Sequence, residues 1–250
     1  MLNKVFVPKA IALCVLASTI GLPPAAAQDG ELSFNTGLNH LRDGRIELAI
    51  KAFKEAIDGD DKNPYFYKGL GLAYLRADKY NDAIKAFRKA LDLSPYYVDV
   101  RNDLGTALVL SGDRAEGKSQ FLKAFNDPQN TIPEIAARNL GRAFMEEGNY
   151  EQALGWFRTA AERNPAYSLA HIGIADVLAS TGRLDEAVLE LEIAEKVAPK
   201  DPELLLALGQ AYFNTGRFTE ARTKLEGVSA SDPAGPFGRR AVELLQRFPQ

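Results

Sequence analysis

Apolar residues recur along this chain at the three- and four-residue intervals that place them on one face of an α-helix. Ala83, Phe87 and Ala90 show this interval in the first half of the chain. The segment from Phe237 to Phe248 shows it near the C-terminus, with charged residues on the opposite face. This spacing predicts amphipathic helices. We expect an all-α protein.

The helical pattern also repeats with a longer, fixed period. Gly37, Gly71 and Gly105 are each 34 residues apart, and Gly141 and Gly209 are separated by twice that period. Most units carry Leu-Gly-x-x-Tyr or a close variant, followed by Ala-x-x-x-Phe-x-x-Ala and then a proline. A period of this length indicates helix–turn–helix units that stack on one another, because one unit alone cannot bury its apolar faces.

The period and the pattern resemble the tetratricopeptide repeat, over the whole chain that follows the first residues. The resemblance implies a right-handed superhelical solenoid of about six helix–turn–helix units with a C-terminal capping helix. The six predicted units span residues 28–235, with approximate limits of 30–63, 64–97, 98–133, 134–167, 168–201 and 202–235. The capping helix is predicted over 236–250.

The repeated positions have a physical meaning within each unit. Small residues at Gly71 and Ala83 let the two antiparallel helices approach closely. Leu70, Tyr74 and Phe87 fill the space around that contact. Glycines that end the first helix of a unit in a left-handed conformation are predicted at Gly44, Gly112, Gly148, Gly182 and Gly216.

Unit three departs from the pattern in two places. Gly117 replaces the usual alanine, at a cost of about 1 kcal/mol in helix propensity. From Gly105 to Gly141 the separation is 36 residues, and the extra residues lie in segment 126–133, which contains two prolines. Proline predicts a non-helical connector here. Two interpretations stay open: a tolerated loop insertion, or a change in superhelix pitch that shapes the binding surface.

The N-terminus has the features of a secretory signal peptide. Lys4 and Lys9 precede an apolar run, and small residues up to Ala27 follow it. The run is shorter than the roughly 20 residues of a membrane span. We therefore predict a signal peptide over residues 1–27, export across the inner membrane, and a soluble periplasmic protein without a transmembrane span. Cys14, the only cysteine, lies in the run without the sequence context of a lipid-modified cysteine.

The composition argues against several classes of function. The net charge is −3, and a nucleic-acid partner would call for a basic stripe instead. His40 and His171 are the only histidines and fall in different units. Loss of Cys14 with the signal peptide leaves no thiolate for a metal site or a nucleophile. We predict no catalytic residue, no metal site and no cofactor, and a protein that is not an enzyme.

In this repeat the second, fifth, ninth, twelfth and thirteenth residues of each unit line the concave face. The first two units place an apolar stripe there, and the fourth adds two arginines. An apolar patch rimmed by charge indicates a protein partner, either an amphipathic helix or an extended peptide. The predicted partner-binding groove consists of Phe34, Leu38, Leu41, Tyr65, Lys68, Leu72, Leu75, Asn102, Arg138 and Arg142. The same rule also places Asp176 and Glu203 on the concave face.

One alternative for the stripe stays open, which is that a tight superhelix buries part of it against the protein itself. Other tetratricopeptide proteins use lysine and asparagine side chains in three consecutive units as a clamp for a C-terminal carboxylate. No three consecutive units here match that set, so we do not predict such a clamp.

The long junction also resembles a narrower family. The resemblance at the junction is carried by residues Phe121–Pro128, Thr131–Glu134 and Asn139–Gly141. The chain resembles the PilF/PilW/Tgl-type pilotins in these residues and in having six repeats after a secretory signal. These bacterial outer-membrane lipoproteins assist assembly of the type IV pilus secretin. The resemblance implies a scaffold for assembly of a type IV pilus or secretion complex, although the chain lacks their lipidation motif. The alternatives are a general cell-envelope scaffold, for example for polysaccharide export, or an enzyme.

Overall fold

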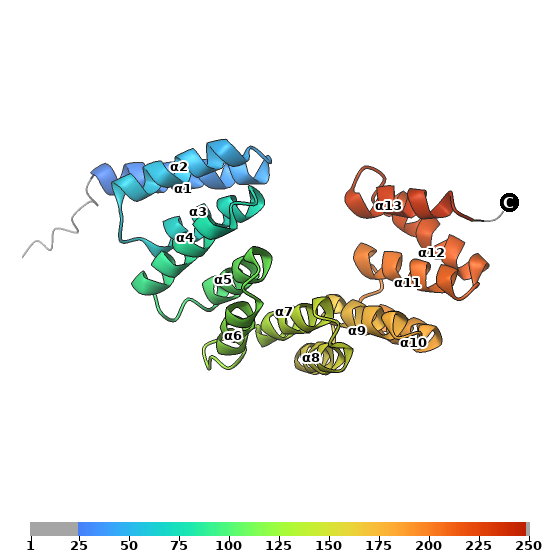
Figure 1. The fold of residues 1–250 in the computed structure, drawn as a ribbon. Coiled ribbons are helices and arrows are strands. Elements are labelled where there is room, and N and C mark those ends of the chain that lie inside the picture. Colours follow the sequence, from blue (N-terminus) through green and yellow to red (C-terminus); the bar gives the residue numbers. More distant parts are fainter. Residues whose placement is uncertain (1–24, 249–250) are drawn as a thin grey trace, which may run out of the picture.

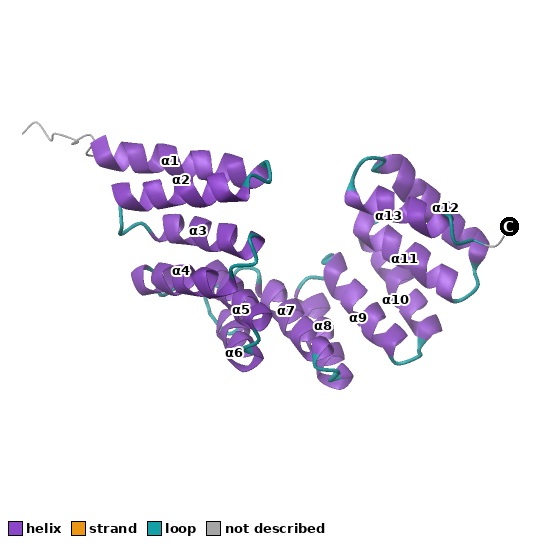
Figure 2. Cartoon of the chain, turned by 45° about the horizontal axis from the view of Figure 1, so that its top comes forward, coloured by secondary structure: helices purple, strands orange, loops and turns teal. Residues whose placement is uncertain are grey.

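The computed structural model describes residues 25–248, and the regular elements in that range are thirteen α-helices (Figure 1, Figure 2). Their bounds are α1 Ala25–Arg42, α2 Ile46–Gly59, α3 Pro64–Arg76, α4 Tyr80–Leu93, α5 Val98–Ser111, α6 Arg114–Phe125, α7 Pro133–Glu146, α8 Tyr150–Arg163, α9 Ser168–Ser180, α10 Leu184–Val197, α11 Pro202–Asn214, α12 Phe218–Ser231 and α13 Pro236–Leu245. The expectation of an all-α repeat superhelix is confirmed.

The helices stack into an arch whose two ends face each other across an open space (Figure 1). Each helix packs against the next one in the chain, and each odd-numbered helix also contacts the next odd-numbered helix. No two even-numbered helices of the described chain approach within 8 Å between Cα atoms. The odd-numbered helices therefore lie on the inner side of the curve, where neighbours converge, and the even-numbered helices lie on the outer side.

Local sequence sets where the helices begin and end. Asn63 caps α3 by accepting a hydrogen bond at Oδ1 from the backbone N–H of Tyr65, at 3.0 Å, with Pro64 in the first helical position. This is a favourable helix start because proline has no N–H to leave unpaired. Gly112 follows α5 at φ +100°. In the equivalent turn after α3, Asp78 adopts φ +56°, a conformation that L-residues rarely take.

Close approach of paired helices explains the repeated glycine. A Cβ atom at Gly71 would lie 2.5 Å from the ring of Phe87, which is fully buried. The unusual Gly117 has the same role from the other helix, because a Cβ there would lie 2.8 Å from the carbonyl oxygen of Gly105. Gly117 is therefore required by the packing of α5 against α6, rather than simply tolerated for its low helix propensity.

The core continues from unit to unit without a gap in the second half of the molecule. One cluster of buried apolar residues extends from α8 to the residues after α13. At its end the ring of Phe248 lies 4.9 Å from that of Phe213 and 6.0 Å from that of Phe218, between centroids. The terminal helix α13 thus covers the apolar face of the last helix pair.

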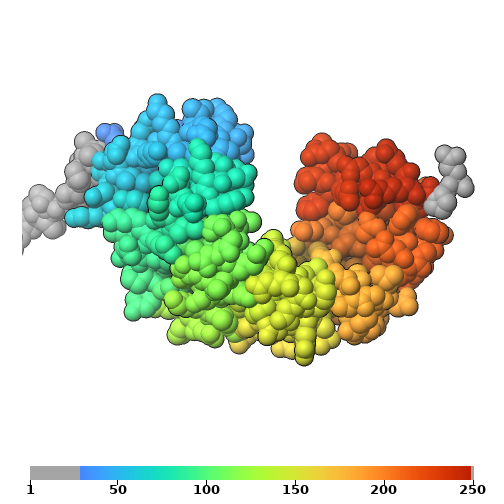
Figure 3. All heavy atoms as spheres, in the orientation of Figure 1, coloured from blue at the N-terminus to red at the C-terminus, as the bar shows by residue number. Residues whose placement is uncertain are grey.

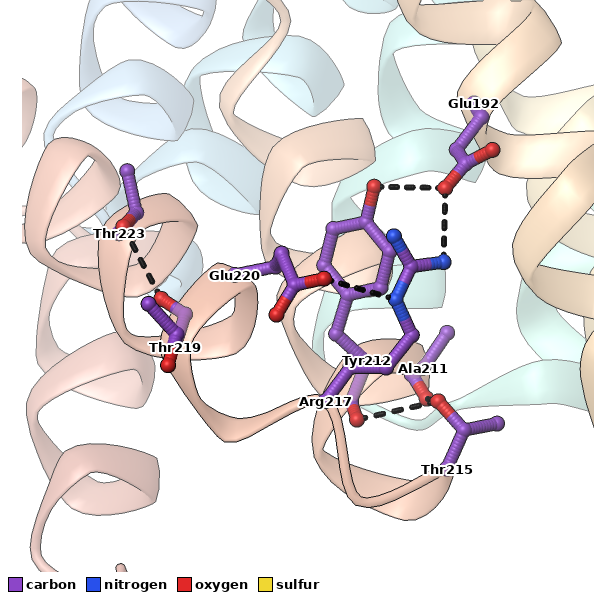
Figure 4. A network of polar contacts seen from close by, with 8 residues as sticks. All are labelled: Glu192, Ala211, Tyr212, Thr215, Arg217, Thr219, Glu220 and Thr223. Carbon is purple, nitrogen blue, oxygen red and sulfur yellow. Dashed lines mark hydrogen bonds and ion pairs between the residues drawn. The ribbon is translucent and has the colours of Figure 1, made fainter.

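A polar network joins the three helices before α13 (Figure 4). The Glu192 carboxylate in α10 accepts hydrogen bonds from the Tyr212 hydroxyl at 2.8 Å and from Nη1 of Arg217 at 3.0 Å. Nε of Arg217 also donates to Glu220 at 3.1 Å. Burial first, and then the hydrogen bond to Glu192, raise the pKa of Tyr212 to about 12. The phenol is therefore a permanent donor that fixes α11 against α10.

The long junction is a loop between α6 and α7, and the stack continues across it because α5 still contacts α7. The Nδ2 group of Asn130 donates to the carbonyl oxygen of Ala124 at 2.7 Å and holds the loop against the end of α6. The effect of the two extra residues on superhelix pitch stays a hypothesis.

The predicted signal peptide falls almost wholly outside the described residues, as does Cys14; only residues 25–27 of it lie in α1. Among the helices between residues 25 and 248, none has the length and apolar character that a membrane crossing requires.

Candidate partner-binding groove

The space-filling view shows a broad hollow between the N-terminal and C-terminal arms of the arch (Figure 3). The odd-numbered helices form its inner wall, and the predicted groove residues come from α1, α3, α5 and α7. Their side chains differ widely in exposure, so the groove has three distinct parts.

The first part is the apolar stripe of α1 and α3. Leu38 and Tyr65 expose 41% and 57% of their surface, which leaves both available to a partner. Phe34 instead packs on the core, with its ring 5.1 Å from that of Phe66 between centroids. Leu72 is half-buried between two core clusters, and Leu75 is also half-buried. The stripe is thus partly exposed and partly packed against the protein itself.

Two of the predicted groove residues are buried, and for them the expectation of an open contact surface is wrong. Leu41 exposes only 7% and belongs to the same core cluster as Phe53. Asn102 also exposes 7%, and its Oδ1 atom has no hydrogen-bond partner among the described residues. The position rule placed them on the concave face, but neighbouring helices cover both side chains.

The second part is a polar cluster between α3 and α5. Nζ of Lys68 lies 3.4 Å from Oδ2 of Asp99 and 5.0 Å from the ring centroid of Tyr97. Burial acts to lower the pKa of Lys68, but Asp103, Tyr97 and Asp99 together outweigh it and raise that pKa. Burial raises the pKa of the Asp103 carboxyl to about 6, even though Lys68 opposes the shift. Sequence analysis missed Asp103, which stands one position after Asn102.

The third part is a cavity of about 350 Å³ on the inner side of α7, α9 and α11, with Phe157 of α8 behind it. Its size is within the range of ligand sites. Its lining residues are Arg138, Arg142, Met145, Glu146, Phe157, Leu169, Ile172, Gly173, Asp176 and Glu203. All but Phe157 and Gly173 occupy positions that the concave-face rule selects. A smaller hollow between α5 and α7 shares Arg142 and Glu146 with it, so the groove continues toward the N-terminal half.

The two arginines on α7 have different partners. Nη2 of Arg142 lies 3.6 Å from Oε1 of Glu146, one turn along the same helix. Arg138 is half-buried, and its only side-chain hydrogen bond to a described residue is a long one of 3.5 Å to Oδ1 of Asn139. Among residues 25–248, no carboxylate oxygen lies within 4.0 Å of its guanidinium. Burial first, and Arg142 in addition, lower the pKa of Arg138, against the attraction of Tyr167 and Glu203.

Acidic groups occupy the opposite side of the cavity. Asp176 on α9 faces the solvent of the groove, but the surrounding walls desolvate its carboxyl and raise its pKa. The nearby charge of Glu203 on α11 raises it further. Neither carboxylate forms an ion pair or a side-chain hydrogen bond with another described residue. Sequence analysis placed both residues on the concave face but did not include them in the site.

The groove combines apolar walls with a few charged side chains. Among the described residues, no group of three or more histidine, cysteine or carboxylate side chains could hold a metal ion. His171 is buried, with its two ring nitrogens directed at Glu190 and at the carbonyl oxygen of Pro165. Apolar walls with a few charged groups fit a polypeptide segment that presents complementary groups.

Comparison with solved structures places the fold among known repeat proteins. PilW, described as a widely conserved type IV pilus biogenesis factor, superposes with a TM-score of 0.67 at 20% identity, over 86% of this chain and 99% of that one. PilF of Pseudomonas aeruginosa superposes with a TM-score of 0.64 at 17% identity, over 86% and 97%. A tetratricopeptide repeat protein of Parabacteroides merdae gives 0.70 at 16% identity, over 90% and 87%. At these identities the likeness shows a shared fold.

Sequence comparison identifies the repeat itself. The Superkiller protein 3 of Schizosaccharomyces pombe is 23% identical over 160 residues, which cover 61% of this chain and 11% of that protein. This chain therefore spans about a tenth of the length of that relative. Two tetratricopeptide repeat profiles match residues 34–194 and 172–236, which together include nearly all of the helical stack. The chain belongs to the tetratricopeptide repeat family.

Proposed function

We propose that this protein is an interaction scaffold that holds a segment of a partner protein in its concave groove. The observation that carries the proposal is the cavity on α7, α9 and α11, where an incompletely paired guanidinium and two unpaired carboxylates surround an apolar floor. Such groups lose hydration without gaining a partner within the chain, so a complementary segment improves their environment on binding. The exposed Leu38 and Tyr65 extend the contact surface toward the N-terminal arm.

A pair of exposed groove residues provides the test. Leu38→Asp combined with Tyr65→Asp places charge on the groove and leaves the buried core unchanged, unlike a change at the half-buried Leu72. We expect capture of the partner from a periplasmic extract to fall about thirtyfold or more, since an interface anchor is worth about 2 kcal/mol. Leu189→Asp is the matched control, because Leu189 is equally exposed, at 57%, on the outer helix α10.

Circular dichroism and melting temperature should be the same for both variants and the unmodified protein. If the groove variant is folded and still captures the same partner as the control does, the N-terminal part of the groove is not the site. Salt-sensitive binding that depends on Arg138 and Arg142 would then place the contact at α7.

We further propose that the protein works in the periplasm and assists assembly of a type IV pilus or secretion complex. The signal-like N-terminus and the likeness of fold to PilW and PilF support this proposal. A general envelope scaffold is the alternative, and it should capture several partners instead of one. Intact mass tests export: we expect a chain that begins at Gln28 in the soluble periplasmic fraction. A species that retains Met1, or that carries a diacylglycerol on Cys14, would contradict this.

A further inference from the structure

We infer that the cavity on α7, α9 and α11 selects a segment in which an apolar side chain stands between one acidic and one basic group. The acidic group faces Arg138 and Arg142, and the basic group faces Asp176 and Glu203. This inference rests on the proposed function of the groove and specifies which segment it holds. It concerns residues that the apolar stripe of α1 and α3 does not include.

The first argument is the separation of charge within one cavity. Both arginines belong to α7, whereas Asp176 and Glu203 belong to α9 and α11. If these groups served only to stabilise the fold, we would expect them to pair with one another across the cavity. Instead, no nitrogen of Arg138 lies within 4.0 Å of either carboxylate. Arg142 already lies 3.6 Å from Glu146 on the same helix. Arg138 on one side of the cavity, and Asp176 and Glu203 on the other, therefore remain available to ligand groups of opposite charge.

The second argument is repulsion within each group. Arg142 lowers the pKa of Arg138, and Glu203 raises the pKa of Asp176. Arg138 and Arg142 stand one turn apart on α7, and Asp176 and Glu203 line the same cavity, so these like charges add to the effect of burial in a groove that water only partly screens. An anion beside the arginines and a cation beside the carboxylates would relieve both repulsions. A ligand with a single charge would relieve only one of them and leave the other side desolvated and unpaired.

The third argument is the floor between the charges. Met145, Leu169 and Ile172 line the cavity together with Phe157, which is almost fully buried. A cavity of about 350 Å³ has room for an aliphatic side chain and the backbone beside it, but the apolar floor offers nothing to a third charged group. The order of ligand groups is thus acidic, apolar, basic, in either chain direction.

Methionine NMR offers a direct probe, because the sequence contains only Met1 and Met145. In the chain that begins at Gln28, labelled with ¹³C at the methionine methyl group, Met145 is the only methionine and its signal reports on the cavity. The probe is the capped tripeptide acetyl-Glu-Leu-Lys-amide, tested together with its reverse sequence. Three controls replace the glutamate, the lysine or both by glutamine. A fourth, acetyl-Lys-Leu with a free carboxylate, tests a chain terminus as the source of the acid.

We expect the dipolar tripeptide, in at least one direction, to shift the Met145 signal with saturation. Loss of either charge should weaken binding about tenfold, because a hydrogen bond to a charged group is worth about 1.5 kcal/mol or more. Arg138→Gln should abolish the preference for glutamate over glutamine and keep the preference for lysine. Asp176→Asn should abolish the preference for lysine over glutamine and keep the preference for glutamate. Arg158→Gln, an exposed arginine on the outer helix α8, should change neither preference.

The comparison of probes on the unmodified protein does not depend on any variant being folded. A Met145 signal that none of the peptides shifts, or that all five capped tripeptides shift equally, overturns the inference. So does a folded Arg138→Gln variant that keeps the full preference for glutamate. If this happens while the change at Leu38 and Tyr65 still removes the partner, the groove function stands and only the charge assignment fails.

Discussion

At the scale of single residues, the turn after α3 contains an unfavourable backbone conformation. Asp78 adopts φ +56°, and its carboxylate accepts a hydrogen bond from the Tyr80 hydroxyl at 2.8 Å. The corresponding turns elsewhere use glycine, which adopts this conformation without a steric cost. The glycines with positive φ are Gly44, Gly112, Gly148, Gly182 and Gly216.

Asp78→Gly should therefore raise the free energy of unfolding by about 0.5–1 kcal/mol. The relief of steric strain outweighs the greater entropy of glycine in the unfolded chain and the loss of an exposed hydrogen bond. Urea denaturation measures the change. Asp58→Gly, on an exposed position of α2, is the control and should lower stability by about 0.3 kcal/mol, which is the difference in helix propensity between aspartate and glycine. Equal losses in both variants would show that the turn conformation is not strained.

His171 makes the stability of the fold depend on pH. Its Nδ1 lies 2.6 Å from Oε1 of Glu190, and its Nε2 lies 3.0 Å from the carbonyl oxygen of Pro165. Both partners are acceptors when Glu190 is ionised, so this arrangement favours the imidazolium form, in which both ring nitrogens donate. The hydrogen bond to Glu190 is the main reason that the pKa of His171 is raised, against the opposing effect of burial. The carbonyl of Pro165 and the charge of Glu190 raise it further.

A raised pKa means that the folded state binds the proton more tightly than the unfolded state does. The resulting stability is complete below the unfolded pKa of about 6.5 and is lost as the pH rises through the folded pKa. We expect the melting temperature to fall as the pH rises above about 6.5, a range that lies above the pKa of Asp103 at about 6. His171→Gln should have a flatter profile. An unchanged slope in this variant would exclude His171 as its source.

At the scale of helices, two glycines show that propensity and packing act independently. Gly155 lies on the exposed face of α8, and a Cβ atom there would have no neighbour within 4 Å. At Gly117 in α6, a Cβ atom would lie 2.6 Å from Cγ2 of Val109 and 2.8 Å from a backbone oxygen. Both glycines weaken helix propensity by about 1 kcal/mol relative to alanine.

The same change to alanine should consequently have opposite effects. Gly155→Ala should raise the free energy of unfolding by about 1 kcal/mol. Gly117→Ala should lower it by roughly 1–3 kcal/mol, because the backbone of α5 must move away from α6. Thermal denaturation of the two variants in one buffer decides the matter. Stabilisation by both would mean that the α5–α6 contact adapts easily and that the close approach is not needed.

The order of the helices and the close contacts within each helix pair were predictable, because they depend on residues at fixed positions within one repeat unit. Gly71 against Phe87 is such a contact. The burial of Asn102 was not predictable in this way, because a position rule names the face of a helix and not the neighbours that cover it. Whether a side chain is covered depends on the angle by which each unit is rotated relative to the unit before it. That rotation results from all contacts between units together.

At the scale of the whole molecule, the position rule selects eight of the ten residues that line the cavity, but it does not indicate which part of the concave face forms that cavity. The rule already included Asp176 and Glu203, which now stand opposite Arg138. The apolar stripe of the first units is easier to recognise in the sequence, because the hydrophobicity of a residue does not depend on the fold. The charged residues of the cavity matter for binding because the groove walls desolvate them. That desolvation depends on the curvature of the arch, which the sequence pattern does not give.

Stacking makes the end of the molecule sensitive to truncation. Removal of all residues after Pro233 deletes α13 and the buried side chains of Ala241, Leu244 and Phe248. The apolar face of α11 and α12 then meets water, so we expect lower solubility and faster hydrogen exchange in the last helix pairs. Exchange in α1–α5 should change little. A uniform rise in exchange along the chain would instead show that the arch unfolds as one cooperative domain.

The asymmetry between inner and outer helices has a mechanical consequence. Odd-numbered helices approach one another along the inner side, whereas the backbones of the even-numbered helices stay farther apart. Long side chains bridge the outer row, for example Arg88 with Glu116 and Lys224 with Glu195. Rotation between units is therefore resisted mainly where each even-numbered helix packs on the next odd-numbered helix, and the ion pairs of the outer row change length as the arch opens or closes. Small rotations add up over the successive helix pairs, so we expect the arch to behave as a shallow spring. A segment seated in the groove would set the distance between its two arms, and pulling on the arms would in turn loosen that segment.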